Sequence, residues 1–531
     1  MSLDMKSLTP KAMLAQRVMP RLEGARLDDK EYVKEALALV EAGVGGFIVF
    51  GGDYWEVRHA LPKLQAKAKI PLLIASDMER GAGQQLKGAT VFPSQMAVSA
   101  ATDVASGDGI TLLSEMTRAV AEEARAAGVH AVFSPVLDVN SNPHNPIICT
   151  RAFSDEPKVV SALGETYVRG LQGCATPVMA CGKHYPGHGD VSLDSHSVLP
   201  ILEKSGEDLE AEDMFPFRRA AMAGVEMIMT AHLSVPALDP AYPASLSQVI
   251  TRNYLRNRGG FEGIVVTDAL NMGALKEKFS AKEIARLAIK AGADILLHPD
   301  EPMEFLKALW ELADKREIIK EEIMAPAARL GRAKAAYCQP VKTSDKDLAP
   351  KIAENAEAAE ALANRALTLI KAAGAFPSIK DVSGEIAHIV LEDDGDSKAG
   401  QVLRSALAAK HKHLSNLFVT KEQAGRLKEE ALRRSRQAAL TIVSIFSKVR
   451  AGKGSSGLSP ELLELGSQIV AKHKKCVVVS FGSPYILKNF MDAQYVVAAY
   501  DACEAMQNAA CRAFMREIVF MGELPVRING A

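Results

Sequence analysis

The chain has 531 residues, of which 48% are hydrophobic and 24% are charged. This composition is typical of a globular protein with large cores and does not indicate disorder. Lys and Arg number 63 and Asp and Glu 64, which leaves a formal net charge of −1. No overall field would therefore draw the protein to nucleic acid or to an anionic membrane, and we expect a small-molecule ligand. At about 150 residues per domain, the length predicts two or three domains.

The cysteines and the first residues bear on the compartment. The seven cysteines are odd in number and scattered, with no C-x-x-C spacing, which favours reduced and mostly buried thiols. Residues 1–16 contain no basic stretch followed by an apolar core, and no apolar run reaches the about 18 residues of a membrane span. We expect a cytoplasmic protein without a membrane span, although Met1 to Leu3 could stand in place of a trimmed export signal.

Short apolar runs, each typical of a buried strand, alternate with amphipathic stretches that end at glycine, as helices often do. Such alternation predicts a parallel sheet. Seven strands are expected, and an eighth near residues 13–22 favours a closed TIM-type barrel over an open sheet. The seven runs are 45–50, 71–77, 130–139, 177–185, 226–233, 263–270 and 293–299.

The predicted barrel domain covers residues 1–337. The polar, proline-containing segment 338–350 is predicted to be a linker, and residues 351–531 are predicted to form a second α/β sandwich domain. A charged helix is expected at 421–437, with a solvated face rather than a nucleic-acid patch, and the glycine-lysine segment 450–460 lacks the spacing of a P-loop. The five expected strands of this domain are 366–372, 385–393, 438–449, 476–484 and 494–501.

Polar residues collect where the predicted barrel strands end, the face on which barrel enzymes build their active sites. The segment KHYPGHGDVSLDSHSVLP (183–200) places three of the 12 histidines within 13 residues. The alternatives are histidines that only stabilise a loop and a zinc site, but the H-x3-H-x7-H spacing matches no common ligand motif. The strand-end residues are Asp77, Asp138, Lys183, His184, His232, Asp268 and His298.

A second informative segment is GFEGIVVTDALNMGAL (260–275). Its single aspartate, Asp268, closes an apolar strand directly before a turn, where a nucleophilic or metal-binding carboxylate would be held rigidly. The alternative is that Asp268 caps the next helix.

Together these two segments resemble family 3 glycoside hydrolases, specifically the bacterial β-N-acetylglucosaminidase branch. Any one match would be weak, but the ordered set spans nearly the whole predicted barrel. Residues 477–490 and 522–526 also resemble the C-terminal domain of two-domain members. Further matches in the barrel are ASDMERGAGQQL (75–86), SPVLDVNSNP (134–143), TRAFSDEP (150–157), MTAHLSVPALDP (229–240), PASLSQVITRNYLR (243–256) and AGADILLHP (291–299).

The resemblance implies that Asp268 is the nucleophile that forms a covalent glycosyl-enzyme, and that His196 is the general acid/base, oriented by Asp194. A histidine departs from the usual carboxylic acid of retaining glycosidases, but imidazole titrates near neutral pH. The residues implied to hold the sugar hydroxyls are Asp77, Arg151, Lys183 and His184. For Arg151 the alternative is a structural salt bridge to Asp155.

The sequence departs from the family pattern at two places. The usual D-x-E-G-G stretch is Asp77-Met78-Glu79-Arg80-Gly81 here, and Ala269 follows the nucleophile where an acidic residue is common.

The resemblance implies a metal-independent enzyme without a cofactor that removes terminal β-linked N-acetylglucosamine with retention. Its substrate would be a small carbohydrate, either a muropeptide from cell-wall recycling or a chitooligosaccharide. The open alternatives are a family 3 β-glycoside phosphorylase or β-glucosidase, a metal-dependent barrel hydrolase, and an inactive sugar-binding protein. The leaving-side glycan, the role of the C-terminal domain and the oligomeric state are left open.

Overall fold

The computed structural model describes residues 5–193, 199–449, 453–473 and 475–528. The chain divides into two compact units whose segments alternate along the sequence. Unit 1 comprises Met1–Val91, Ser114–Val139 and Pro157–Asn355, and unit 2 comprises Phe92–Leu113, Asn140–Glu156 and Ala356–Ala531.

Unit 1 contains a curled sheet of parallel strands in chain order, from β2 to β8, with every neighbour parallel. The chain order of neighbours is what repeated β/α units produce. The strands are β1 (Val18–Met19), β2 (Arg21–Glu23), β3 (Gly46–Phe50), β4 (Leu73–Ser76), β5 (Ala131–Val132), β6 (Met179–Tyr185), β7 (Met227–Thr230), β8 (Ile264–Thr267) and β9 (Leu296–Leu297).

Pro20 explains why the first strand is in two pieces. β1 pairs in parallel with β9, whereas β2 pairs with β3. Pro20 lies between them and has no N–H to donate to a ladder. A parallel bridge between Val266 and Ile295 connects β8 to the chain that enters β9. Among the described residues the ring is thus closed by eight strands, with β1 and β2 counted as one, and the predicted barrel is confirmed.

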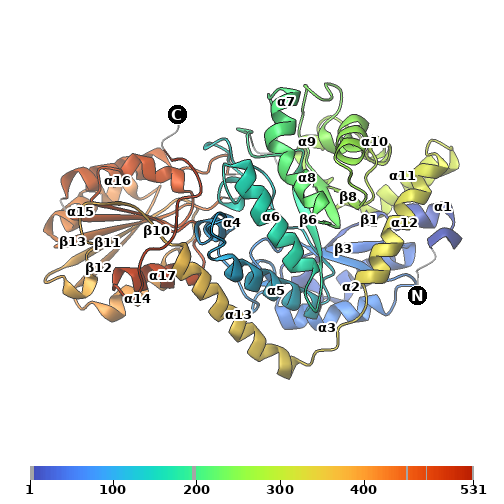
Figure 1. Cartoon of the computed structure of the whole chain (residues 1–531). Coiled ribbons are helices and arrows are strands. Elements are labelled where there is room, and N and C mark those ends of the chain that lie inside the picture. Colours follow the sequence, from blue (N-terminus) through green and yellow to red (C-terminus); the bar gives the residue numbers. More distant parts are fainter. Residues whose placement is uncertain (1–4, 194–198, 450–452, 474, 529–531) are drawn as a thin grey trace. The chain divides into compact units, whose positions relative to one another are not determined.

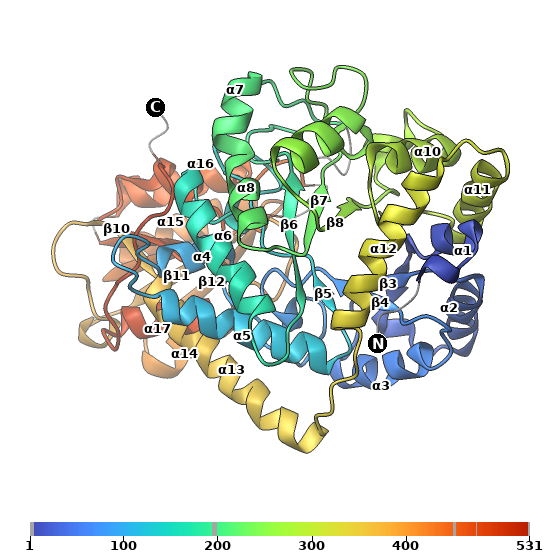
Figure 2. The ribbon, with the colours of Figure 1, turned by 45° about the vertical axis from the view of Figure 1, so that its right-hand side comes forward.

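Helices lie outside these strands (Figures 1 and 2). Their ends follow ordinary capping rules. Asp29 caps α2 through the N–H groups of Glu31 and Tyr32, and Gly43 ends that helix in the left-handed conformation. The longer helices with all or most of their residues in unit 1 are α1 (Pro10–Ala15), α2 (Lys30–Ala42), α3 (Tyr54–Gln65), α5 (Ile110–Ala126), α6 (Pro157–Gln172), α8 (Phe215–Met222), α10 (Ala281–Ala291), α11 (Pro302–Asp314) and α12 (Lys320–Tyr337).

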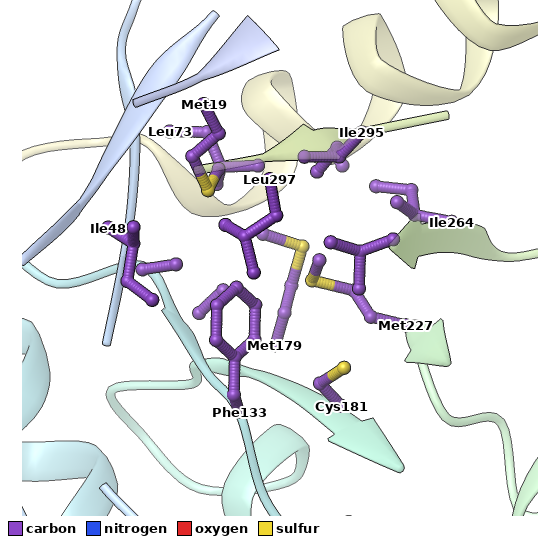
Figure 3. Packing of buried hydrophobic residues seen from close by; sticks show 14 of the residues in the cluster. Met19, Ile48, Leu73, Phe133, Met179, Cys181, Met227, Ile264, Ile295 and Leu297 are labelled. Carbon is purple, nitrogen blue, oxygen red and sulfur yellow. The ribbon is translucent and has the colours of Figure 1, made fainter. Parts of the chain in front are cut away.

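The inside of the barrel is a packed core rather than a pore (Figure 3). Apolar side chains from successive strands meet there, and Phe133, Met179 and Leu297 are all at most 2% exposed. Each strand contributes alternate residues, as expected for side chains that point to opposite faces of a sheet. Polar groups are therefore restricted to the ends of the strands.

Unit 2 contains a six-stranded sheet in the order β10-β15-β14-β13-β11-β12, in which only β10 is antiparallel to its neighbour. Figure 1 shows α15 and α16 on one side of this sheet and α14 and α17 on the other, so the predicted α/β sandwich is confirmed. The strands are β10 (Thr368–Ala372), β11 (Ile386–Glu392), β12 (Leu414–Thr420), β13 (Leu440–Phe446), β14 (Cys476–Ser480) and β15 (Tyr495–Ala498). The helices are α4 (Gln95–Ala100), α14 (Gln401–Lys410), α15 (Ala424–Gln437), α16 (Pro460–Lys472) and α17 (Glu504–Phe514).

Strand β12 was not predicted from the sequence. Its sequence LSNLFVT places polar residues among the apolar ones, and only two of its seven residues are buried. A strand with a single neighbour, as β12 has in pairing with β11, needs less apolar character than a central strand.

The compact units are divided differently from the predicted domains. The predicted boundary at residue 350 falls inside the helix α13 (Asp345–Ala366). Two earlier segments, 92–113 and 140–156, belong to unit 2, where hydrogen bonds tie them: Glu523 N donates to Ala100 O at 3.0 Å, and Asn140 Nδ2 donates to Tyr485 Oη at 2.7 Å. The predicted boundaries 1–337, 338–350 and 351–531 stay a prediction.

Two buried histidines, His130 in unit 1 and His388 in unit 2, make the stability depend on pH. Burial lowers the pKa of His130 to about 3 and that of His388 to about 4. Neutral rings fit their contacts, since His130 Nδ1 accepts from Ile74 N at 3.0 Å, and His388 Nε2 lies 2.9 Å from Ser444 Oγ. Their stabilisation is complete above the unfolded pKa of 6.5 and is lost as the pH falls through 4 and 3.

We therefore expect the free energy of unfolding to fall by about 1.4 kcal/mol per pH unit for each of these histidines below about pH 6. Urea unfolding between about pH 7.5 and 5 measures this slope. His388→Asn should flatten it, whereas the same change at the exposed His413 should not. An unchanged slope in His388→Asn would contradict the assignment.

Candidate active site

Three of the predicted site residues continue the inward-facing rows of the barrel. Side chains alternate along a strand, so two residues beyond the last core position the next side chain again faces inward. The core positions on β4, β6 and β8 are Leu73, Ala75, Met179, Cys181, Ile264 and Val266. The next inward positions are Asp77, Lys183 and Asp268, which therefore share the carboxyl end of the barrel, the usual place of barrel active sites.

The charges of these three residues all affect the pKa of the buried Cys181 thiol. Burial raises its pKa, the Lys183 ammonium opposes this rise, and the carboxylates of Asp77 and Asp268 add to it. The inward positions on three strands thus form one electrostatic group.

Lys183 lies between two carboxylates. Its Nζ is 2.7 Å from Asp77 Oδ1 and 2.7 Å from Glu79 Oε1. The lysine side chain is 3% exposed and that of Glu79 is 7% exposed, whereas Asp77 is 26% exposed. Asp77 is therefore the member of this cluster with access to solvent, and a carboxylate can accept a hydrogen bond from a hydroxyl on either oxygen.

The backbone around Asp268 is fixed on both sides. Asp268 N donates to Thr230 O at 2.9 Å, and Ala269 N donates to Asp268 Oδ1 at 2.7 Å. The fully buried His232 ring contacts Ala269 O through Nε2 at 3.0 Å and Ser245 Oγ through Nδ1 at 2.7 Å. Asp268 is half-buried, so a rigid carboxylate lies at the end of β8.

His184 is oriented by Asp138, which is fully buried. Asp138 Oδ2 lies 2.7 Å from His184 Nδ1, and its Oδ1 accepts from the backbone N–H groups of His184 and His188 at 3.1 and 2.7 Å. Burial alone would raise the pKa of Asp138, but the two imidazoles and these hydrogen bonds lower it below its usual value. Burial lowers the pKa of His188 to about 4, and the neighbouring His184 contributes, so His188 is neutral at neutral pH.

Of the three remaining predicted site residues, the structure describes one, Arg151. Arg151 belongs to unit 2, in the turn Cys149–Arg151, where its Nη1 donates to Ile147 O at 3.0 Å. Asp155, considered as its alternative partner, pairs with Arg527 at 3.0 Å. The predicted acid/base pair, Asp194 and His196, lies outside the described residues.

Three structural roles were not predicted from the sequence: Glu79 pairs with Lys183, Asp138 orients His184, and His232 contacts Ala269. Glu79 could have been found, because it continues by two residues the alternation that leads to Asp77. Asp138 and His232 were noted only as polar strand-end residues, since their partners lie 46 and 37 residues away along the chain.

Among the described residues, no group of three or more His, Cys, Asp or Glu side chains is arranged to hold a metal ion. In the same residues no helix has the length and apolar character needed to cross a membrane.

Comparisons with known proteins agree on one family. The family model described as "Glycosyl hydrolase family 3 N terminal domain" matches residues 13–333. "Beta-hexosaminidase A" of Pseudoalteromonas piscicida is 32% identical over 386 residues, which cover 68% of this chain and 62% of that relative. The chain thus spans less than two thirds of that relative's length.

Two further comparisons cover a larger share of the matched protein. A "Beta-hexosaminidase" of Chromobacterium violaceum is 34% identical over 300 residues, covering 56% of this chain and 82% of that relative. The structure of a glycoside hydrolase family 3 β-N-acetylglucosaminidase from Paenibacillus sp. str. FPU-7 superposes with a TM-score of 0.84 at 29% identity, covering 98% of this chain and 99% of that one.

The cluster around Lys183 predicts a clear stability effect. Lys183→Met should lower the free energy of unfolding by about 3–5 kcal/mol, because two nearby carboxylates lose their buried counter-charge. The double variant Lys183→Met/Glu79→Gln should recover part of that loss. Urea unfolding measures both. Lys276→Met, at a lysine paired on the exposed surface with Asp300, is the control, and an equal loss there would refute the cluster's role.

Proposed function

The chain belongs to glycoside hydrolase family 3, and on this premise we propose that it is an exo-acting β-N-acetylglucosaminidase. It hydrolyses terminal β-linked N-acetylglucosamine with retention, through a covalent glycosyl-enzyme on Asp268. The observation that supports this most is the convergence of Asp77, Lys183 and Asp268 on the inward rows of three barrel strands. The relatives named β-hexosaminidase at 32% and 34% identity support the choice of sugar.

In the first step the Asp268 carboxylate attacks the anomeric carbon while the bond to the leaving oxygen breaks. The rigid backbone on both sides of Asp268 suits this role, because a nucleophile that is already positioned needs no reorganisation. The electron pair of the broken bond stays on the leaving oxygen, which takes a proton from the general acid. Water then attacks the anomeric carbon, the bond to the Asp268 oxygen breaks and frees the carboxylate, the water gives its proton to the residue that acted as general acid, and the configuration is retained.

We assign the proton transfers to His196, with Asp194 as its orienting partner, on the resemblance of the D-S-H triplet to the family motif. A neighbouring carboxylate favours the protonated imidazole and fixes its orientation.

We assign the sugar hydroxyls to Asp77, Lys183, His184 and Arg151. Support comes from the solvent access of Asp77, the fixed ammonium of Lys183 and the His184 ring held by Asp138. Each can exchange hydrogen bonds with hydroxyl groups once water leaves. Arg151 is assigned from the resemblance alone.

The substrates we propose are small glycans such as muropeptides from cell-wall recycling or chitooligosaccharides. All seven cysteines are free thiols, five of them buried, which fits a reducing compartment. We therefore propose that the activity is cytoplasmic.

The test is release of nitrophenol from the β-N-acetylglucosaminide and the β-glucoside. The wild type should prefer the N-acetyl sugar, and Asp268→Ala should lose about 10,000-fold or more in kcat, as removal of a nucleophile does. Asp300→Asn, at an exposed strand-end aspartate, is the matched control and should retain activity.

The rival functions give different results in the same assay. Stimulation by phosphate would favour a phosphorylase, preference for the glucoside a β-glucosidase, and inhibition by a chelator a metal-dependent hydrolase. No turnover of either sugar, or full activity in Asp268→Ala, would refute the proposal.

A further inference from the structure

The segment between Gly187 and Lys204 starts and ends against one buried carboxylate, that of Asp213. Asp213 closes the π-helical turn η5 (Leu209–Asp213) and is 0% exposed. Lys204 Nζ donates to Asp213 Oδ2 at 2.8 Å. On the other side, a Cβ atom placed on Gly187 would lie 2.6 Å from Asp213 Cβ. Residues 17 positions apart in the sequence thus pack against the same side chain.

At the start of the segment, which we call its first root, position 187 requires glycine for two reasons. Its φ of +139° lies in a region that residues with a side chain rarely adopt, and Asp213 fills the space that a side chain would need. Gly187 N donates to His184 O at 2.9 Å, and the next residue, His188, donates its N–H to Asp138 at 2.7 Å. Asp213 therefore packs on the turn that connects the His184 network to the segment.

At the end of the segment, which we call its second root, several contacts hold residues 200–204. Leu202 N donates to Ser234 O and Ser234 N donates to Pro200 O, both at 2.9 Å. The Lys204 ammonium, on a side chain that is 14% exposed, also lies 3.1 Å from Glu212 Oε2. Lys204 is thus fixed between one buried and one exposed carboxylate.

The charges around Asp213 explain why Lys204 matters. Burial raises the pKa of Asp213 to about 6; Lys204 opposes this rise, while Asp190 and Glu212 add to it. Without Lys204, ionised Asp213 would be a buried charge without compensation. Asp213 is mostly ionised at neutral pH, and the ion pair with Lys204 is lost as Asp213 takes up a proton in acid.

We propose that Asp213 is a positioning residue for acid/base catalysis: through Gly187 and Lys204 it fixes both roots of the segment whose sequence contains Asp194 and His196. This inference rests on the proposed function, since it takes its consequence from the assigned acid/base pair.

The consequence depends on the leaving group. A poor leaving oxygen must receive a proton as its bond to the anomeric carbon breaks, whereas a dinitrophenolate departs with the electron pair and needs no proton. A defect in positioning the acid should therefore slow only the first kind of substrate. A general loss of structure or of sugar binding would slow both.

The experiment compares phenyl and dinitrophenyl β-N-acetylglucosaminides at neutral pH for the wild type, Asp213→Asn, Lys204→Met and Glu212→Gln. For the first two variants, kcat/KM for the phenyl substrate should fall about 10- to 100-fold, against about threefold or less for the dinitrophenyl one. Glu212→Gln, which changes the exposed partner of the same lysine, should match the wild type on both. Lys204→Met provides a second variant, because Asp213 can take up a proton when its partner is missing.

The outcomes separate this inference from the function on which it rests. If the wild type cleaves neither substrate, the proposed function fails. If it cleaves both and the Asp213 and Lys204 variants lose both equally, or lose neither, only the positioning role is overturned. Selective loss on the phenyl substrate in either variant supports it.

Discussion

The ammonium group of Lys183 is held almost out of solvent by two carboxylates, Asp77 and Glu79, each 2.7 Å away. Moving a charge out of water costs several kcal/mol, and only close partners of opposite sign offset that cost. The ends of β4 and β6 must therefore keep their relative positions, or buried charge is left without compensation. The inward row of β8 brings Asp268 to the same end of the barrel. The ion pairs of Lys183 therefore stabilise the same end of the barrel at which the proposed nucleophile, Asp268, lies.

Two other buried carboxylates in unit 1, those of Asp138 and Asp213, each fix the backbone near the point where β6 is followed by a loop. Asp138 accepts the backbone N–H of His184 near the end of β6 and that of His188 in the turn that follows, and it orients the His184 ring. Asp213 packs on Gly187 in the same turn and binds Lys204. Hydrogen bonds from the His184 ring and from two backbone N–H groups stabilise the Asp138 carboxylate, and the Lys204 ammonium compensates the charge of Asp213. The residues that would hold the sugar and the segment that would deliver the proton are in this way connected to one small network.

The local pattern of the sequence was sufficient to predict the architecture and part of the candidate site. Alternating strands and helices predicted both the barrel and the second sheet, and the end of each apolar strand marked Asp77, Lys183 and Asp268. The sequence pattern did not predict β12, whose single neighbour allows polar residues in the strand, and it does not display the grouping of residues 92–113 and 140–156 with unit 2. Long-range contacts decide both that grouping and the partners of Glu79, Asp138 and Asp213, and a single sequence does not display such contacts. Asp194 and His196 lie outside the described residues, and their assignment rests on the resemblance alone.

The proposed function requires a covalent bond between Asp268 and the sugar. This bond can be detected by incubating the protein with a fluorinated N-acetylglucosaminyl fluoride that slows hydrolysis of the glycosyl-enzyme, and by following the protein by intact mass and peptide mapping. We predict a mass increase of one fluorosugar residue, located on Asp268 and missing from Asp268→Ala. A label on another residue, or turnover of the reagent without any labelled protein, would contradict it.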